Sequence, residues 1–543
     1  MVPTSCSGMI ASAHPVASQA GAAALAAGGN AFDAAVAVAA TLNVVEPYMS
    51  GLAGMGYATM WVAAEAQARV LDFVTAVPRS FPAGRFHHRE QMARGPLSVG
   101  VPGNLAGWCA LWRAYGSLPL GKLLAPAAQV AEDGFAVGRF GSEEINMHGP
   151  RLACLAGTGA AFRSNYPFCD GIRIGATIRQ PELAATLRLV AEEGPGVLYG
   201  GPLGQRIVSH LRSLGGTLEL GDLVEAEAVW REPLAAPYRG LLVHVPPPPC
   251  EGFQFLLTLR LLEGFDVTAL GSGTAAHLDL VIRATRLAAG ARIANNFPDA
   301  DEVARLLSDR HVGALRRRLR DGDGMEGPTE QWTPSAPAGE DPGHTTSFSV
   351  ADRDGNLVCV TQSLGSVFGS GVVVPGTGVL LNNFLYWADV QAGSPNRTAP
   401  GRPLPSCMAP SISTRSGVPV LALGTPGSYG ILQTQAQAMV HHLDFGLPLQ
   451  EAVEAPRARI WDGRLVEVEN RINAEVISAL RHLGHDARAF TTGWTMKVGG
   501  MQAIQRDGTD GRLTGAADPR RDGSAMAVQV IAVDTVLRVK RWI

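Results

Sequence analysis

Near the middle of the chain, residues 343–350 change abruptly from a polar, flexible composition to one typical of a β-strand. The preceding residues 321–341 are rich in Gly, Pro, Asp and Glu, which predicts an exposed linker. Apolar and small polar residues then alternate through 346–350, residues 352–356 supply a turn, and a return strand begins directly after them. The sequence therefore predicts a linker that leads straight into a β-hairpin of the core.

Thr345 stands where this linker meets the strand. If the peptide bond after His344 breaks, Thr345 gains a free α-amine that can accept the proton of its own hydroxyl. An unperturbed α-amine has a pKa of about 7.7–8.0, close to the pH at which a general base works best. Alternatively, Thr345 and Thr346 simply favour a strand, as β-branched residues do. The position predicts a self-cleaving precursor with Thr345 as nucleophile, first on the carbonyl of His344 and then on a substrate amide.

The overall composition restricts the class of protein. Hydrophobic residues make up 46% and charged residues 17% of the chain, as in a soluble globular protein with a large core. A net charge of −3 gives no electrostatic footprint for nucleic acid or a membrane. The chain shows neither an apolar run long enough to span a bilayer nor a secretory signal. Seven scattered cysteines lack metal-ligand spacing and fit reduced thiols, so we expect a cytoplasmic protein without a metal or an organic cofactor.

Helical patterns of small and amphipathic residues occur on both sides of the proposed junction. They predict helices over residues 17–27, 31–42, 120–133, 181–193, 203–214, 275–295 and 430–442. There is no internal repeat.

An ordered series of motifs extends over nearly the whole chain. It runs through residues 28–37, 50–56, 101–103, 246–249, 368–371, 378–383, 424–427, 454–457 and 518–520. The series resembles the γ-glutamyltransferase family of N-terminal-nucleophile hydrolases, which includes γ-glutamyltranspeptidases and cephalosporin acylases.

The resemblance implies an α+β fold, an αββα four-layer sandwich made of two chains from one precursor. A cut between His344 and Thr345 would leave residues 1–344 as the large (α) subunit and residues 345–543 as the small (β) subunit. Both would remain partners in one interwoven domain, because neither sheet can bury its inner face alone. A heterotetramer of two such pairs is one option for the assembly.

The resemblance also points to residues that assist the nucleophile. Gly427 and Ser428 match the family's oxyanion turn, whose backbone N–H donors are typically worth about 2.7–4 kcal/mol in the transition state. The same residues would equally suit a plain turn before the helix predicted to follow. Ser363 occupies the place of a second hydroxyl that assists processing in the family, although a strand serine is an equal alternative. Arg457 and Arg520 match family positions at which we favour structural ion pairs.

Several substrate-binding positions depart from the transpeptidase pattern. Val74 stands where a transpeptidase has the arginine that holds the α-carboxylate of the donor. Phe384 and Trp387 replace a glutamine and the aspartate that binds the α-ammonium, and Gly365 replaces an asparagine.

A final departure is found at a pair of serines that contacts the same carboxylate in the family. The pair reads as Ser406 and Cys407 here, with an apparent extra residue before it. A carboxylate or ammonium that is buried without a partner costs several kcal/mol, so we expect the pocket to reject γ-glutamyl groups. An aromatic pocket favours a flatter or more apolar acyl group. We therefore predict an acylase or amidohydrolase that acts on a small-molecule amide.

Two alternatives stay open. One is a γ-glutamyltransferase or glutathione hydrolase in which an arginine from elsewhere, such as Arg79 or Arg85, reaches the pocket. The other is an unprocessed, catalytically silent relative that acts as a binding protein. An intact chain on a denaturing gel would support the second alternative.

Overall fold

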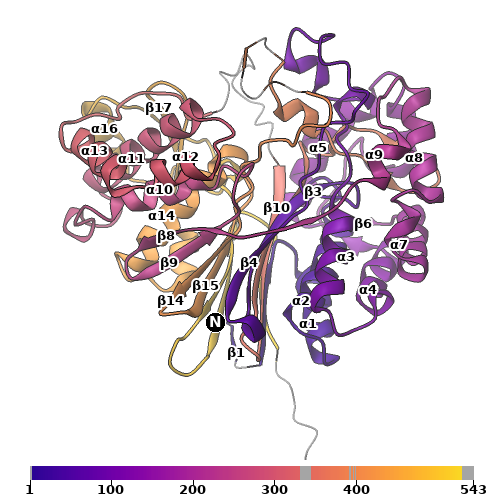
Figure 1. The fold of residues 1–543 in the computed structure, drawn as a ribbon, viewed down its shortest axis with the longest axis horizontal. Helices are drawn as coiled ribbons and strands as arrows, with labels where there is room; N and C mark the ends of the chain where they lie inside the picture. Colours follow the sequence, from indigo (N-terminus) through magenta and orange to yellow (C-terminus); the bar gives the residue numbers. More distant parts are fainter. Residues whose placement is uncertain are drawn as a thin grey trace, which may run out of the picture.

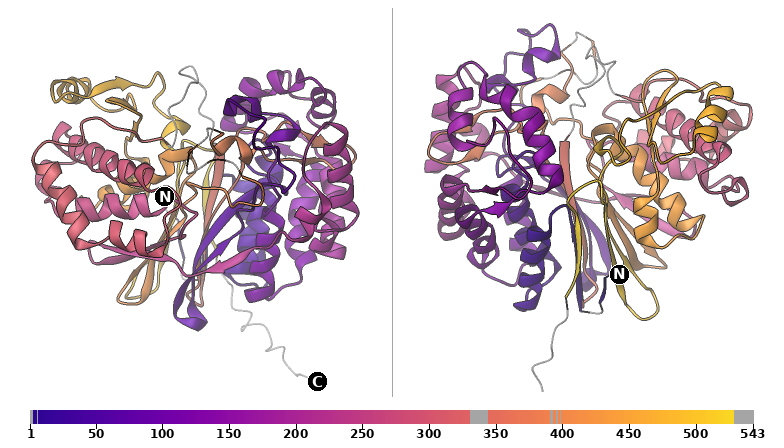
Figure 2. Two further views of the ribbon diagram at one scale, coloured as in Figure 1. Left: turned by 45° about the horizontal axis from the view of Figure 1, so that its top comes forward. Right: turned by 180° about the vertical axis from the view of Figure 1, so that it is seen from behind.

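The computed structural model describes residues 3–5, 7–330, 344–390, 393–394, 397 and 399–528. Two seven-stranded sheets lie face to face in the middle of the molecule, and helices cover both outer faces (Figure 1). The indigo and magenta helices lie on one side, and the helices from α10 onward lie on the other (Figure 2). This arrangement confirms the predicted αββα sandwich.

Each sheet is antiparallel throughout and contains strands from both sides of residue 344. In spatial order, the first sheet consists of β21 (Ser524–Ala527), β2 (Gly8–Ser12), β10 (His344–Asp352), β11 (Leu357–Gly365), β3 (Met55–Val62), β4 (Gln67–Asp72) and β7 (Val229–Arg231). The second consists of β1 (Thr4–Ser5), β20 (Leu513–Ala517), β19 (Gln502–Arg506), β15 (Val418–Gly424), β14 (Ser411–Arg415), β9 (Leu241–Val245) and β8 (Leu234–Tyr238). The parts before and after the predicted cut are therefore interwoven.

The helices of the first outer layer pack on the sheet that contains β10. They include α1 (Pro15–Ala26), α2 (Ala31–Val45), α3 (Asn104–Tyr115), α4 (Leu120–Asp133), α5 (Arg139–Ala153), α7 (Pro181–Glu193) and α8 (Pro202–Ser213). Every residue of α2 is buried, and its start is fixed by Asn30, whose side chain accepts hydrogen bonds from the backbone N–H groups of Phe32 and Asp33. The helix ends at Val45, which places Glu46 at the end of the layer.

The second outer layer covers the other sheet. It consists mainly of α10 (Phe253–Leu262), α11 (Ala275–Ala294), α12 (Ala300–Leu306), α13 (Asp309–Arg320), α14 (Ile431–Leu443), α15 (Leu449–Glu454) and α16 (Ala474–His482). All the helices predicted from sequence are present, with small differences at their ends. No helix within the described part of the chain is both long and apolar enough to cross a membrane.

The predicted exposed linker is confirmed at residues 321–323, 326 and 328, which are exposed, and is wrong at residues 329–330. Residues 331–343 lie outside the described part of the chain, but Thr329 and Glu330 are buried. Arg292 Nη2 donates to the carbonyl of Thr329 at 2.8 Å, and Arg459 Nη2 lies 2.7 Å from Glu330 Oε1. The polar residues here are partners of buried arginines, a role that composition alone does not distinguish from exposure to solvent.

Candidate active site

Strand β10 presents its first residues to two different environments because side chains alternate along a strand. On one face, Ser349 Oγ donates to the carbonyl of Gln502 in the opposite sheet at 3.0 Å, and Ser347 contacts Gly424. Because side chains alternate, Thr345 lies on the same face of β10 as Ser347 and Ser349, the face that points to the opposite sheet. Thr346 shares the other face with Phe348, which packs in the core beneath the first helical layer.

A β-bulge occurs at the predicted scissile bond. His344 pairs with Gly365 and Thr345 with Ser363, so the register shifts between the first two residues of β10. Bulges change the direction of a side chain and are frequent beside active sites. Thr345 Oγ1 donates to Ser363 Oγ at 3.3 Å, and Ser363 Oγ donates to the carbonyl of His344 at 2.7 Å. One hydrogen-bonded path thus joins the predicted nucleophile to the carbonyl that it would attack.

A buried ion pair holds the strand just beyond this bond. Arg521 pairs with Glu46, and only 2% and 1% of these residues are exposed. Arg521 Nη1 donates to the carbonyl of Thr345 at 3.0 Å, and Thr346 Oγ1 donates to Glu46 Oε2 at 2.6 Å. Such extra hydrogen bonds are what a buried ion pair needs to offset its desolvation. From sequence, Thr346 was expected to serve only strand geometry. The ion pair was not predicted, because its two members are far apart in the chain.

The loop predicted to stabilise an oxyanion follows β15. Gly427 has φ +123° and Ser428 has φ +56°, a region that non-glycine residues seldom adopt and that is enriched at functional sites. Arg459 Nη1 donates to the carbonyl of Gly427 at 2.9 Å, which fixes the loop before α14. Gly500 adjoins both this loop and Arg521, since its N–H donates to Thr425 Oγ1 at 3.1 Å and a Cβ there would overlap the Arg521 side chain.

Four of the residues predicted to line the acyl pocket belong to one hydrophobic cluster or pack against it. Phe384, Trp387 and Cys407 are buried in this cluster, and the half-buried Val74 packs against it. The Trp387 ring lies 6.1 Å from that of Tyr429. Burial, with help from nearby carboxylates, raises the pKa of the Cys407 thiol, so this cysteine is a neutral, apolar group rather than a nucleophile.

Ser406 precedes Cys407 in the chain and is also buried. It forms an isolated bridge with Cys250, and its Oγ accepts a hydrogen bond from the Met408 N–H at 3.2 Å. This hydroxyl is therefore turned to its own backbone, as in a local serine turn.

The glycine at position 365 is explained by its surroundings. Its φ is +100°, and a Cβ there would overlap Asn383 Oδ1 and lie 3.4 Å from Trp387 Nε1. Asn383 Oδ1 is already the acceptor for the Ser366 N–H at 2.8 Å. The asparagine that transpeptidases carry at this position would be strained at this φ and would clash with Asn383. The backbone conformation therefore favours glycine at position 365.

A buried arginine that the sequence did not reveal lies against the Tyr386 ring. The Arg89 guanidinium lies 4.8 Å from the ring centroid of Tyr386, next to Phe384 and Trp387 in the chain. Burial lowers the pKa of Arg89. Of the two arginines suggested from sequence, Arg79 pairs with Glu225 at the surface and Arg85 is exposed. No motif pointed to Arg89, because only the fold brings it to Tyr386.

His344 lines a cavity of about 810 Å³ on the other side of the predicted cut. Its wall carries acidic side chains of α5 and several cations, namely Glu143, Glu144, Arg94, Arg139, Arg151, Lys497 and Arg520. Burial and the neighbouring His148, Arg521 and Arg94 hold the pKa of His344 well below its usual range, so the imidazole is neutral.

This fold and site define an enzyme of the N-terminal-nucleophile hydrolase type, and comparisons with known proteins agree. The family model described as Gamma-glutamyltranspeptidase matches residues 17–528, so the chain belongs to this family. The Acylase ACY 1 proenzyme of Pseudomonas sp. (strain SE83) is 36% identical over 96% of this chain and 93% of its own length. The Glutathione hydrolase proenzyme of Bacillus subtilis (strain 168) is 29% identical over 96% and 92%.

A solved structure supports the same assignment. The crystal structure of cephalosporin acylase from Bacillus halodurans matches with a TM-score of 0.87 and 30% identity, covering 97% of each chain. The predicted family, fold class and enzyme class are confirmed. The roles of individual site residues and the position of the cut stay predictions.

Proposed function

We propose that the chain is a self-cleaving acylase that hydrolyses a small-molecule amide through an ester on Thr345. The observation that carries this proposal is the path from Thr345 Oγ1 through Ser363 Oγ to the His344 carbonyl at a β-bulge. The names of the relatives support it, because acylase and glutathione hydrolase proenzymes both align over nearly the whole chain.

In the precursor, Thr345 Oγ1 attacks the carbonyl carbon of His344. The carbon–nitrogen bond breaks as the carbon–oxygen bond forms, and the hydroxyl proton passes by way of Ser363 to the departing nitrogen. Water then opens the ester, which leaves a carboxylate on His344 and an α-amine on Thr345. The ion pair of Glu46 and Arg521 keeps the strand in place, since Arg521 holds the carbonyl of Thr345 on the side away from the broken bond.

In the mature enzyme, the α-amine takes the Thr345 hydroxyl proton as the oxygen attacks a substrate amide. Backbone N–H groups at Gly427 and Ser428 would stabilise the negative charge on the carbonyl oxygen, worth about 2.7–4 kcal/mol per donor. The leaving amine receives a proton and departs, and water hydrolyses the acyl ester.

The acyl group that fits is not γ-glutamyl. Trp387 stands where an α-ammonium would need a carboxylate, and the carboxylates of Glu251 and Glu330 are already paired with Arg292 and Arg459. An unpartnered buried charge costs several kcal/mol. We expect a γ-glutamyl anilide to be hydrolysed at least about 100-fold more slowly than an anilide with a glutaryl or aryl-acyl group.

Mass spectrometry of the purified protein tests the nucleophile. The wild type should yield residues 1–344 and 345–543 as separate fragments, and Thr345→Ala should stay intact. Thr345→Ser is the matched control, because it keeps the hydroxyl and should still be cut. An intact wild-type chain would instead support the silent binding protein.

A γ-glutamyl donor is the second candidate, and Arg89 is the observation that favours it. Its guanidinium at Tyr386 could pair with a substrate carboxylate, although a glutaryl group would satisfy it equally well. The γ-glutamyl and glutaryl groups differ only by the α-ammonium, so the hydrolysis rates of their two anilides distinguish the two candidates. Faster turnover of the γ-glutamyl anilide, lost in Arg89→Met, would replace the first candidate by the second.

A further inference from the structure

Two histidines and a glutamate meet in the wall of the cavity beside the predicted cut. Glu144 and His148 lie one turn apart on α5, and His344 is the first residue of β10. Glu144 Oε2 is 3.7 Å from His148 Nε2 and 3.5 Å from His344 Nε2. One potential ligand atom of each residue lies within 4.8 Å of the others. These side chains are 10%, 24% and 13% exposed and line the cavity, so an ion could reach them.

This spacing fits a zinc ion. Zinc binds imidazole nitrogen and carboxylate oxygen at about 2.0–2.2 Å, so two ligand atoms of a tetrahedral ion lie about 3.3–3.6 Å apart. The two separations from Glu144 therefore need little adjustment, and the two histidine nitrogens lie within 4.8 Å of each other. Residues i and i+4 face the same side of a helix, which is how helical zinc motifs supply two ligands. A third ligand from β10 leaves the fourth position for a water molecule in the cavity.

The two arginines that act most directly on His344 have acceptors of their own. Arg521 pairs with Glu46, and Arg94 Nη1 donates to the carbonyl of Val367 at 2.6 Å. The carboxylate of Glu144 would offset part of the charge of the ion, as expected for a buried cation site.

We propose that Glu144, His148 and His344 bind one zinc ion, and that this ion slows self-cleavage of the precursor. The effect on cleavage rests on the proposed function, whereas the binding does not. During the amide-to-ester shift, the carbonyl carbon of His344 must move toward Thr345 Oγ1. An ion that fastens the imidazole of His344 to α5 restrains the same residue that has to move. After the cut, all three ligands stay on the large fragment, so the site persists but no longer restrains a scissile bond.

Metal binding is measured on full-length Thr345→Ala, in which His344 remains joined to the next residue. Calorimetric titration with zinc chloride should give one ion per chain, and cobalt(II) should give the visible absorption of a tetrahedral site. Removing a residue that only hydrogen-bonds to a zinc ligand typically lowers zinc affinity about 10–100-fold. Adding His148→Ala removes a ligand itself, so zinc affinity should fall by at least about 100-fold. His482→Ala, on an exposed histidine of α16, is the matched control. No bound zinc, or equal affinity in the His148 and His482 variants, would overturn the site.

Cleavage is followed by cell-free synthesis of the wild-type chain with zinc or with a chelator. We expect zinc to lengthen the lifetime of the full-length band about tenfold. The chelator should reverse this effect, and His148→Ala should be cut at one rate under both conditions. Equal rates for the wild type with zinc and with chelator would overturn the regulatory role. A chain that is never cut would contradict the proposed function instead, while the titration would still decide the metal site.

Discussion

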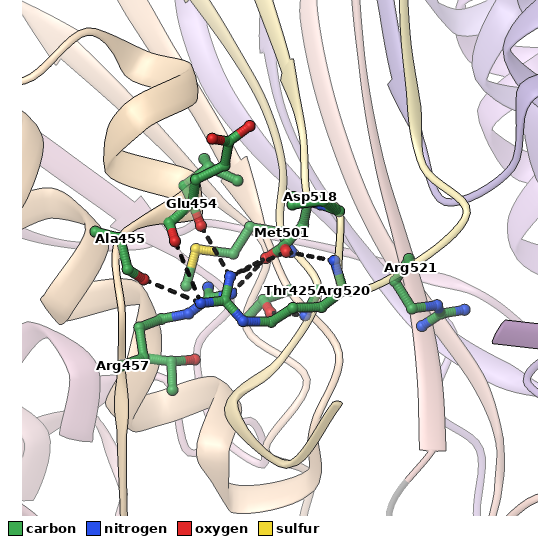
Figure 3. A network of polar contacts seen from close by, with 12 residues as sticks. Thr425, Glu454, Ala455, Arg457, Met501, Asp518, Arg520 and Arg521 are labelled. Carbon is green, nitrogen blue, oxygen red and sulfur yellow. Dashed lines mark hydrogen bonds and ion pairs between the residues drawn. The ribbon is translucent and has the colours of Figure 1, made fainter. Parts of the chain in front are cut away.

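Arg520 and Arg521 are consecutive residues whose guanidinium groups enter two different buried networks (Figure 3). Arg520 Nη1 donates to Asp518 Oδ1 at 3.0 Å and lies among the loops around α15. Arg521 points away from that network, pairs with Glu46 and donates to the carbonyl of Thr345. Both arginines are fully desolvated, so burial alone does not tell them apart.

The partners of each arginine make the difference. Arg520 pairs with the carboxylates of Asp518 and Glu469, and both carboxylates also bind Arg457. Arg520 also donates to the carbonyls of Val453 and Ala455 at 3.1 and 3.0 Å. All of these partners belong to the same structural network. The sequence prediction of structural ion pairs at Arg457 and Arg520 is confirmed. The Arg521 network instead ends on the backbone of the predicted nucleophile. We infer that the first network holds the fold together and that the second positions the reacting strand.

The largest expected effect is on stability, from Arg520→Met. Removing one member of a buried ion-pair network leaves uncompensated charge on Asp518 and Glu469 and typically costs about 3–5 kcal/mol. Urea unfolding of the Thr345→Ala chain measures this loss without interference from cleavage. In wild-type background, the folded fraction of Arg520→Met should still be cut at Thr345. A stable but uncut variant would break the distinction between the networks.

The reverse result is expected for the second network. The double variant Glu46→Leu, Arg521→Met replaces both charges by apolar side chains, which is often nearly neutral for stability. Cleavage should slow about 100-fold, equivalent to about 2.7 kcal/mol, because the carbonyl of Thr345 loses its charged donor. A pulse-chase gel gives the rate and urea unfolding the stability. Cleavage at the wild-type rate would mean that Arg521 is structural, like its neighbour.

These long-range partners mark the limit of what the sequence can predict. Periodicity and motif order located the hairpin, Thr345 and Ser363, since those signals are local or carried by the family resemblance. The Glu46–Arg521 pair and the contact of Arg89 with Tyr386 join segments that no spacing rule connects. Phe384 and Trp387 are buried in an apolar cluster as expected, but the arginine against Tyr386 was not predicted.

A smaller effect is expected from Thr346→Val, which keeps the β-branched shape and removes the hydroxyl. Hydrogen bonds to charged groups are worth about 1.5–3 kcal/mol, and Glu46 keeps its bond to Arg521. We expect the variant to lose about 1–2 kcal/mol of stability and to be cut up to about tenfold more slowly. Ser349→Ala on the same strand, which also loses one buried hydroxyl, is the control for general strand weakening. Equal slowing in both variants would remove Thr346 from the nucleophile network.

The smallest expected effect is a pH dependence of stability that belongs to the structural network and not to the hydrolysis reaction. Burial, followed by repulsion from Arg457 of the structural network, lowers the pKa of His441 to about 4. Its ring packs 5.4 Å from that of His277, whose pKa burial lowers to about 3. Below about pH 6.5 the unfolded chain binds protons at these histidines before the folded chain does. Their contribution to the free energy of unfolding is therefore full above pH 6.5 and decreases as the pH falls to about 4.

The size of this loss follows from the same difference in pKa. Between pH 6.5 and 5.5, each histidine should remove roughly 1 kcal/mol from the free energy of unfolding. His441→Gln should flatten the dependence by about that amount in urea titrations at the two pH values. Hydrolysis by the mature enzyme should instead follow the α-amine of Thr345, whose unperturbed pKa is about 7.7–8.0. If His441→Gln moved the pH profile of hydrolysis and left the pH dependence of unfolding unchanged, then the structural network would be coupled to the chemistry after all.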